Sequence, residues 1–178
     1  FAQGTANSTV RNSSVRGNGD DGLASWSSID KSTNSQARIA EHNSFVGNTV
    51  ELGWRASAIG LFGGKSHVIK DNLIVNNFSG AGIRLNTVFD GHNFDLNTDG
   101  GISISHNKLV RSGTTNDFYG NTRGAIDFQE MKVDIRNVTV SDNLIVRPYA
   151  EEIRADFGLD GSALSPRGIT LRDNKRDD

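Results

Sequence analysis

Apolar residues recur in this chain in short alternating stretches that are separated by polar corners, and these stretches return at a regular interval. The clearest marker is an asparagine that is followed three residues later by a valine. It occurs at Asn12, Asn43, Asn72, Asn107 and Asn143, with Val15, Val46, Val75, Val110 and Val146. Successive marker asparagines lie 29 to 36 residues apart. Such a recurrence is typical of a solenoid, in which each repeat stacks on its neighbour.

Two further sets of apolar positions complete each repeat. One set stands three residues before an asparagine, at Ile69, Ile104, Val140 and, ahead of a sixth asparagine at Asn174, Leu171. The other set follows later in each unit, at Leu23, Ile59 with Leu61, Ile83 with Leu85, Ile126 with Phe128, and Ile153. Three alternating stretches per repeat predict three short strands per coil.

The sequence therefore predicts an all-β fold, a right-handed parallel β-helix of five to six coils that forms one domain over residues 1–178. We expect the five marker asparagines to stack in an inward corner column, where side chains about 4.8 Å apart hydrogen-bond along a ladder. Their valines should form the flanking column. The ordinary alternative is that asparagine is only a common turn residue. Because neither end carries a capping element, we also expect an interior segment of a longer protein.

The composition and charge of the chain exclude several classes of function. Only 35% of the residues are hydrophobic, and 20 glycines accompany 2 prolines, which suits many short strands joined by tight turns. The net charge of −2, with both signs interspersed, argues against a nucleic-acid partner. No apolar run approaches the length of a membrane span, so no membrane partner is expected either. Without cysteine the chain has no disulfide, thiolate metal site or thiol nucleophile.

One stretch of the repeated scaffold contains two adjacent aspartates among glycines, and none of the five later segments that share its framework repeats this pair. Gly17-Asn18-Gly19-Asp20-Asp21-Gly22 has the G-x-G-x-x-G spacing of dinucleotide-binding loops, but its two carboxylates would repel a pyrophosphate. Adjacent carboxyls can hold different pKa values, so that one protonates a leaving group while another activates water, as in glycoside hydrolysis. Asp20 and Asp21 are therefore the candidate catalytic residues. The plainer interpretation is a solvated turn.

A second acidic stretch resembles a metal-binding loop. Asp95-Leu96-Asn97-Thr98-Asp99-Gly100 places oxygen ligands at alternate positions before a glycine, as at the start of a calcium loop. Asp95, Asn97 and Asp99 are thus candidate calcium ligands, although a polar turn is the commoner explanation of such a pattern. Hydrolysis by carboxylates requires no cofactor, so calcium would serve stability.

The third strand of each coil offers an outward column beside the acidic pair. Its expected members are Ala24, Gly60, Arg84, Asp127 and Arg154. Arg84 and Asp127 would be neighbours on successive coils, either as a surface ion pair worth under about 1 kcal/mol or as part of a groove. Together with Trp26, whose ring could stack on a sugar, they are the candidate substrate-binding residues. Three variable loops, at 28–36, 89–101 and 112–123, could wall such a groove.

The segment from Val15 to Ser27, Val-Arg-Gly-Asn-Gly-Asp-Asp-Gly-Leu-Ala-Ser-Trp-Ser, resembles the signature of the mycodextranase and α-1,3-glucanase family, glycoside hydrolase family 87. Weaker similarity extends over roughly positions 8 to 150. The resemblance implies secreted bacterial endo-hydrolases of α-1,3-linked glucans, built on a right-handed β-helix, with anomeric inversion by aspartates on neighbouring coils. Asp20 and Asp21 match the paired aspartates of the family. On the following coil Ala56 and Ser57 stand where the family has an acid.

These features favour an extracellular, polysaccharide-degrading glycoside hydrolase whose partner is an α-glucan, acting as a monomer within a larger chain. Two alternatives remain open. A pectin-type hydrolase or lyase would use the same fold, although a lyase needs a cation cluster or calcium beside a basic residue. A non-catalytic carbohydrate-binding or adhesive β-helix needs only a flat stacked surface. The fold by itself does not decide among them.

Overall fold

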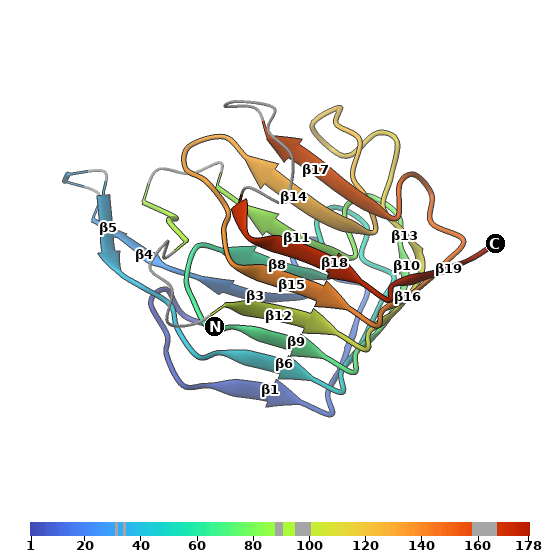
Figure 1. Cartoon of the computed structure of the whole chain (residues 1–178), viewed down its shortest axis with the longest axis horizontal. Helices are drawn as coiled ribbons and strands as arrows, with labels where there is room; N and C mark the ends of the chain where they lie inside the picture. The colour runs from blue at the N-terminus through green and yellow to red at the C-terminus, as the bar shows by residue number, and fades with distance from the viewer. Residues whose placement is uncertain (31, 34, 88–90, 95–100, 158–166) are drawn as a thin grey trace.

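The computed structural model describes residues 1–30, 32–33, 35–87, 91–94, 101–157 and 167–178. Five successive coils each contribute one strand to three parallel sheets, and a sixth coil contributes strands to two of them (Figure 1). The described part of the chain contains no α-helix, and hence none long and apolar enough to cross a membrane. The predicted parallel β-helix and its number of coils are confirmed.

Three sheets run along the stack of coils. The first contains β1 (Thr9–Arg11), β6 (Ser44–Val46), β9 (Val68–Lys70), β12 (Ile102–Ser105), β15 (Val138–Ser141) and β18 (Ile169–Arg172). The second contains β2 (Ser14–Arg16), β7 (Thr49–Glu51), β10 (Leu73–Asn77), β13 (Lys108–Ser112), β16 (Leu144–Val146) and β19 (Lys175–Asp177). The third contains β3 (Leu23–Trp26), β8 (Ile59–Phe62), β11 (Ile83–Asn86), β14 (Ile126–Glu130) and β17 (Ile153–Phe157).

One antiparallel hairpin projects from this stack. Its strands, β4 (Ser28–Asp30) and β5 (Ser35–Arg38), follow directly after β3 (Figure 1). The first of the three variable loops that the sequence marks is therefore an outgrowth of the first coil. It leaves the parallel stacking undisturbed, because β3 still pairs in register with β8.

The core lies between the three sheets and is built from columns of stacked apolar side chains. On the third sheet the register aligns Leu23, Ile59, Ile83, Ile126 and Ile153 in one inward column. The adjacent outward column consists of Ala24, Gly60, Arg84, Asp127 and Arg154. Both columns match the sequence prediction. Burial of each large apolar side chain contributes about 1.5–3 kcal/mol, so these columns stabilise every coil against the next.

An asparagine ladder occupies the corner between the first and second sheets. At each step the Oδ1 atom of one asparagine accepts hydrogen bonds from the backbone N–H and the Nδ2 atom of the asparagine one coil earlier, at 2.9–3.2 Å. The corner column is Ser13, Asn48, Asn72, Asn107, Asn143 and Asn174. The ladder satisfies buried amide groups that would otherwise lack partners.

This column corrects the predicted ladder in the first two coils. Asn12 and Asn43 are not members, and Ser13 and Asn48 take their places. The residue before the ladder position has a left-handed backbone with φ of 51–66°, and Asn12 and Gly47 occupy that position. Asn43 lies at an earlier corner, where its Oδ1 atom accepts a hydrogen bond from the backbone N–H of Ser8 at 3.1 Å. The spacing of Asn43 to a following valine is coincidental.

The predicted valine column is correct only at Val15. Side chains alternate along a strand, so the residue two positions after the ladder faces the core and the residue three positions after it faces outward. The inward column of the second sheet is Val15, Val50, Ile74, Leu109 and Ile145, in which Val15 is partly buried and the others are buried. Val75, Val110 and Val146 are half-buried on the other face, and Val46 belongs to the first sheet.

Replacing Asn72 by Leu should lower the free energy of unfolding by about 1–3 kcal/mol, because the buried groups that bond to its amide lose their partners. Urea unfolding of the intact protein measures this change. Asn7→Asp, at an exposed left-handed corner that Asp also tolerates, is the matched control and should change little. Equal stability of the Asn72→Leu variant and the wild type would refute a structural role for the ladder.

Candidate functional site

A groove of about 800 Å³ lies against the outer face of the third sheet, beside the corner that carries the acidic pair. The structure brings four of the predicted residues to it. These are Asp20, Asp21, Trp26 and Arg84. Small residues from the coils above Asp21, including Ser57, Gly80 and Ala81, also line the groove and leave room for a ligand.

Asp21 stands just before β3 and reaches over the next coil. Its Oδ1 atom accepts a hydrogen bond from the backbone N–H of Ser57 at 2.9 Å. A Cβ atom on Gly60 would lie only 3.2 Å from Oδ2 of Asp21, so a glycine at this position accommodates the close approach of the carboxyl. Burial raises the pKa of Asp21 to about 6, even though the Ser57 N–H and the Arg84 cation lower it. A carboxyl with this pKa can carry a proton in mildly acidic solution.

Asp20 lies beside Asp21 on the exposed rim of the groove. Its Oδ1 atom accepts a hydrogen bond from the backbone N–H of Asp21 at 2.9 Å, and Asn18 donates from Nδ2 to its backbone carbonyl. The ring of Trp54, which is 58% exposed, covers Gly19, where a Cβ atom would lie 2.3 Å from the indole. Local side chain to backbone bonds thus hold the acidic corner in one shape.

Arg84 and Asp127 are register neighbours, as the sequence predicts, but each bonds elsewhere. Arg84 donates from Nη2 to Oε1 of Gln129. Asp127 accepts from the backbone N–H of Gly124 at 3.0 Å and faces Nη1 of Arg123 at 3.4 Å. Asp127 is 0% exposed, so it is Arg123 that reaches the groove wall. The expected surface ion pair is replaced by a buried one.

Burial also shifts the pKa values of Arg84 and Asp127. It lowers the pKa of Arg84 to about 10, and the nearby Arg123 cation adds to that effect. Burial raises the pKa of Asp127, against the hydrogen bond from Gly124 and the charges of Arg123 and Arg84. Arg84 therefore remains a cation at neutral pH and contributes positive charge to the groove floor near Asp21.

Trp26 forms part of the groove floor. Its ring centroid lies 5.9 Å from that of Phe62 and 5.8 Å from that of His92, in tilted arrangements. Its Nε1 atom donates a hydrogen bond to the backbone carbonyl of Phe1 at 3.2 Å. The half-buried ring is thereby fixed in orientation, with part of its surface open to the groove.

The candidate calcium ligands Asp95, Asn97 and Asp99 lie outside the described residues, as does most of the 89–101 loop. In the parts of the chain that the structure describes, no group of three or more His, Cys, Asp or Glu side chains could hold a metal ion. Calcium binding at the 95–100 segment stays a prediction.

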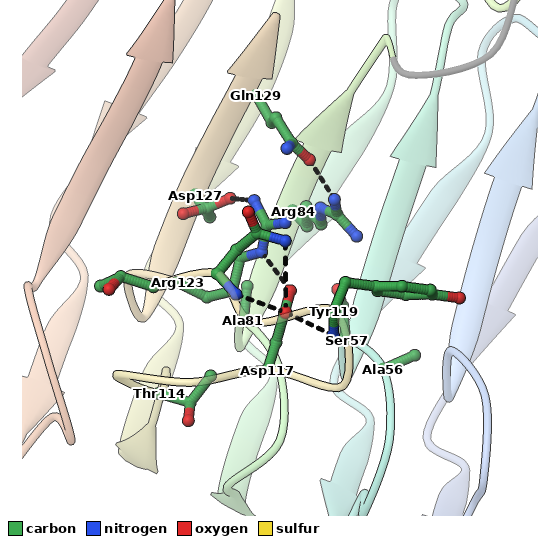
Figure 2. A network of polar contacts seen from close by, with 12 residues as sticks. Ala56, Ser57, Ala81, Arg84, Thr114, Asp117, Tyr119, Arg123, Asp127 and Gln129 are labelled. Atoms are coloured by element: carbon green, nitrogen blue, oxygen red, sulfur yellow. Dashed lines mark hydrogen bonds and ion pairs between the residues drawn. The ribbon is translucent and has the colours of Figure 1, made fainter. Parts of the chain in front are cut away.

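The third of the variable loops predicted to wall the groove does so, and it contributes Tyr119 and Arg123 to the wall (Figure 2). We call its part from Gly113 to Arg123 the 113–123 loop. Arg55 and Glu130 are further lining residues. Glu130 is buried, and its Oε2 atom lies 2.7 Å from Nη2 of Arg167. No pattern in the sequence points to Arg55 or Glu130, because Phe118 and Arg167, which they contact, lie on other coils. Arg123 has its partners Asp117 and Asp127 nearby in the chain, but the alternation of the strands does not mark it.

Three solved structures cover most of this chain. The Agl-KA catalytic domain has 45% sequence identity over 86% of this chain, with a TM-score of 0.79. The catalytic unit of a thermostable family 87 α-1,3-glucanase from Streptomyces thermodiastaticus has 28% identity over 88% of this chain, with a TM-score of 0.75. An aspartate-to-alanine variant of a family 87 α-1,3-glucanase catalytic domain, in complex with tetrasaccharides, has 19% identity over 98% and a TM-score of 0.71, which supports the fold alone.

The chain spans 26%, 28% and 31% of the lengths of these three chains, respectively. No protein-family model matches the sequence, and no curated protein does. The structural neighbours nevertheless agree with the resemblance carried by the Asp20-Asp21-Gly22 segment. The predicted relationship to glycoside hydrolase family 87 is confirmed: the chain is a parallel β-helix whose structural neighbours are catalytic domains of family 87 α-1,3-glucanases.

Proposed function

We propose that the protein hydrolyses an α-1,3-linked glucan and that Asp21 donates a proton to the leaving glycosidic oxygen. The observation that carries the proposal is the setting of Asp21, whose half-buried carboxyl borders a groove of about 800 Å³ and has a pKa raised to about 6. A general acid works best when its pKa lies near the operating pH. The likeness to α-1,3-glucanase catalytic domains supports the choice of linkage.

Anomeric inversion requires a second carboxylate that activates water on the opposite face of the sugar, roughly 6.5–9.5 Å from the acid. On the coil that follows Asp21, Ala56 and Ser57 flank the groove and offer no carboxylate. Asp20 is adjacent in the chain, and its Oδ1 atom bonds to the backbone of Asp21. We therefore assign the second carboxylate to Asp20.

Asp127 is too far from Asp21 to be that second carboxylate. The third sheet has the order β17-β14-β11-β8-β3, so β14 lies three strands from β3. At about 4.8 Å per strand, the two positions are about 14 Å apart, which exceeds the separation that an inverting pair uses. Asp156 on β17 is farther still. Acids on these strands can therefore shape the groove but do not act on the same bond as Asp21.

The remaining groove residues suit a sugar polymer. Trp26 in the floor and Tyr119 in the wall present aromatic surface to a ligand, and Arg84 and Gln129 supply polar groups beside them. The resemblance to a family of secreted α-1,3-glucanases leads us to expect an extracellular protein. The proposed partner is the polysaccharide, with the protein acting as a monomer.

A non-catalytic carbohydrate-binding β-helix is the second candidate, and the exposed rings of Trp54 and Tyr119 favour it. It accounts for the aromatic surface but not for the half-buried carboxyl of Asp21 with its raised pKa. Incubation of the intact protein with α-1,3-glucan, mixed α-1,3/1,4-glucan, dextran and pectin separates the candidates. Shorter oligosaccharides released from α-1,3-glucan would support hydrolysis. Binding of the glucan without release of products would support the carbohydrate-binding function.

Asp20→Asn and Asp21→Asn in the intact protein should each reduce turnover of α-1,3-glucan by about 100-fold or more, because proton transfer is lost. The melting temperature should remain nearly unchanged, since neither side chain belongs to the core. Asp173→Asn, at an exposed left-handed corner, is the control and should retain full activity. Near-normal turnover in both test variants would reduce the pair to a structural turn.

The pH dependence of hydrolysis should follow the proton on Asp21. Because its pKa is about 6, kcat/KM should fall as the pH rises through 6 and the acid deprotonates. The Arg84 cation lowers this pKa, so Arg84→Gln should raise it and move the alkaline limb to higher pH. Arg172→Gln, at an exposed position on β18, controls for loss of charge. A limb that stays in place or moves to lower pH in Arg84→Gln contradicts the assignment.

The calcium prediction has an independent test. If Asp95, Asn97 and Asp99 bind calcium, chelation should lower the melting temperature of the intact protein, and calcium should restore it. Asp99→Ala should remove this sensitivity, because a ligand is lost. A melting temperature that chelation does not change would make this segment an ordinary polar turn.

A further inference from the structure

The 113–123 loop is closed at its base and shaped at its tip by hydrogen bonds. At the base, Thr114 and Arg123 exchange two backbone hydrogen bonds of 2.9 and 2.7 Å. At the tip, Oδ1 of Asp117 accepts from the backbone N–H groups of Tyr119 and Asn121, both at 2.8 Å. A loop with this many internal bonds has one defined conformation rather than an ensemble of alternatives.

Buried charges tie this loop to the third sheet. Nε of Arg123 lies 2.7 Å from Oδ2 of Asp117, and Nη1 lies 3.4 Å from Oδ2 of Asp127 (Figure 2). Arg123 is 2% exposed and Asp117 is 9% exposed. Removing one partner from such a group leaves an uncompensated buried charge, which is strongly destabilising. Asp127 on β14 thereby fixes Arg123, and Arg123 fixes the tip of the loop.

The ionisation states agree with this network. Burial raises the pKa of Asp117, but the hydrogen bonds from Asn121 and Arg123 outweigh it, and the net pKa is lowered. Asp117 is therefore an anion under ordinary conditions and pairs with the Arg123 cation. The same two hydrogen-bonding partners that lower this pKa also define the shape of the loop.

The loop presents two aromatic rings that the core does not need. Phe118 is 67% exposed and Tyr119 is 70% exposed, and their rings form an edge-to-face pair with centroids 5.2 Å apart. The guanidinium carbon of Arg55 lies 5.4 Å from the centroid of Phe118. Arg55 belongs to the segment between β7 and β8, two coils before the loop. The loop thus spans the intervening coil, where Gly80 and Ala81 line the groove.

Rigid exposed aromatic side chains are suited to ligand binding. A ring that is already held in place loses little conformational entropy when a ligand stacks on it. Tyr119 borders the groove together with Arg55, Gly80 and Ala81. Ala56 and Ser57, the small residues on the coil after Asp21, line the same groove as Tyr119 (Figure 2).

We propose that Asp127 is a positioning residue, which acts through Arg123 and Asp117 to hold the 113–123 loop so that Tyr119 forms a sugar-stacking wall of the groove. The inference rests on the proposed function, because it takes the ligand to be an α-1,3-linked glucan. Asp127 is 0% exposed and lies on the third strand from β3, so it touches neither the sugar nor the bond that Asp21 protonates. Its effect on catalysis is indirect.

Binding of a linear α-1,3-linked tetrasaccharide to the intact protein, measured by calorimetry in an Asp21→Asn background, tests the wall without hydrolysis. Tyr119→Ala should weaken binding by about 5- to 30-fold, as loss of an aromatic anchor does in other interfaces. Asp127→Asn should weaken it in the same range. The two changes combined should be no worse than Tyr119→Ala alone, because both act through one wall. Asp142→Asn, at an exposed corner, is the matched control.

Kinetics with Asp21 intact provide the readout that separates positioning from catalysis. Asp127→Asn should raise KM, leave kcat within about 3-fold, and leave the alkaline limb of the pH profile in place. Arg123→Lys, which keeps the charge but loses the forked geometry, should show a partial version of the same change. If Asp127→Asn does not fold, Asp117→Asn at the loop tip is measured for the same outcomes.

Three results would overturn the inference. They are unchanged tetrasaccharide binding in Asp127→Asn and Tyr119→Ala, additive losses in the double variant, and a fall in kcat by orders of magnitude in Asp127→Asn at constant KM. A wild-type protein that binds the tetrasaccharide with the expected variant losses but cleaves no glucan would instead overturn the proposed function and leave the wall in place. Absence of wild-type binding would refute both.

Discussion

Stacking of one coil on the next by parallel backbone hydrogen bonds is the constraint on which the rest of this structure depends. It fixes each residue of the three parallel sheets into a column with its counterparts on the neighbouring coils, about 4.8 Å away. The asparagine ladder strengthens this stacking at one corner, because each Oδ1 atom serves both the backbone and the side-chain amide of its neighbour. Any group placed on an outward column therefore has neighbours that are set by register rather than by chain proximity.

The groove follows from that register. Asp21 reaches over Gly60 because the outward column is glycine on the following coil, and Arg84 stands one strand farther. Small residues at Ser57 and Ala81 keep the space above the acid open. A larger side chain at Gly60 would displace the carboxyl, change its burial and alter its pKa. The packing of the scaffold around Asp21 therefore determines the acid–base properties of the site.

Three aspartates near the groove have the same side chain but different pKa values and roles, because their surroundings differ. Asp21 has burial as its dominant influence, so its pKa is raised to about 6 and it can supply a proton. Asp117 has its burial outweighed by hydrogen bonds, so it remains an anion and organises a loop. Asp127 is completely buried against Arg123 and Gly124 and does not line the groove. The amino-acid composition does not distinguish these three aspartates.

The sequence by itself determined the repeat, the three strands per coil, both columns of the third sheet and the acidic pair at Asp20 and Asp21. These depend on alternation and period, which are local properties that the chain displays directly. The sequence-based prediction misplaced the ladder at Asn12 and Asn43. Asparagine also suits the left-handed corner position, and its spacing to a following valine does not show whether the side chain points into the core. Only the tertiary structure decided that Asp127 pairs with Arg123 instead of Arg84, and that the 113–123 loop reaches Arg55 two coils away. The contact between Arg55 and Phe118 joins side chains on different coils. Arg123 and Asp127 are only four residues apart, but their side chains meet because the closed loop returns Arg123 to the start of β14, and the alternation of the strands encodes neither contact.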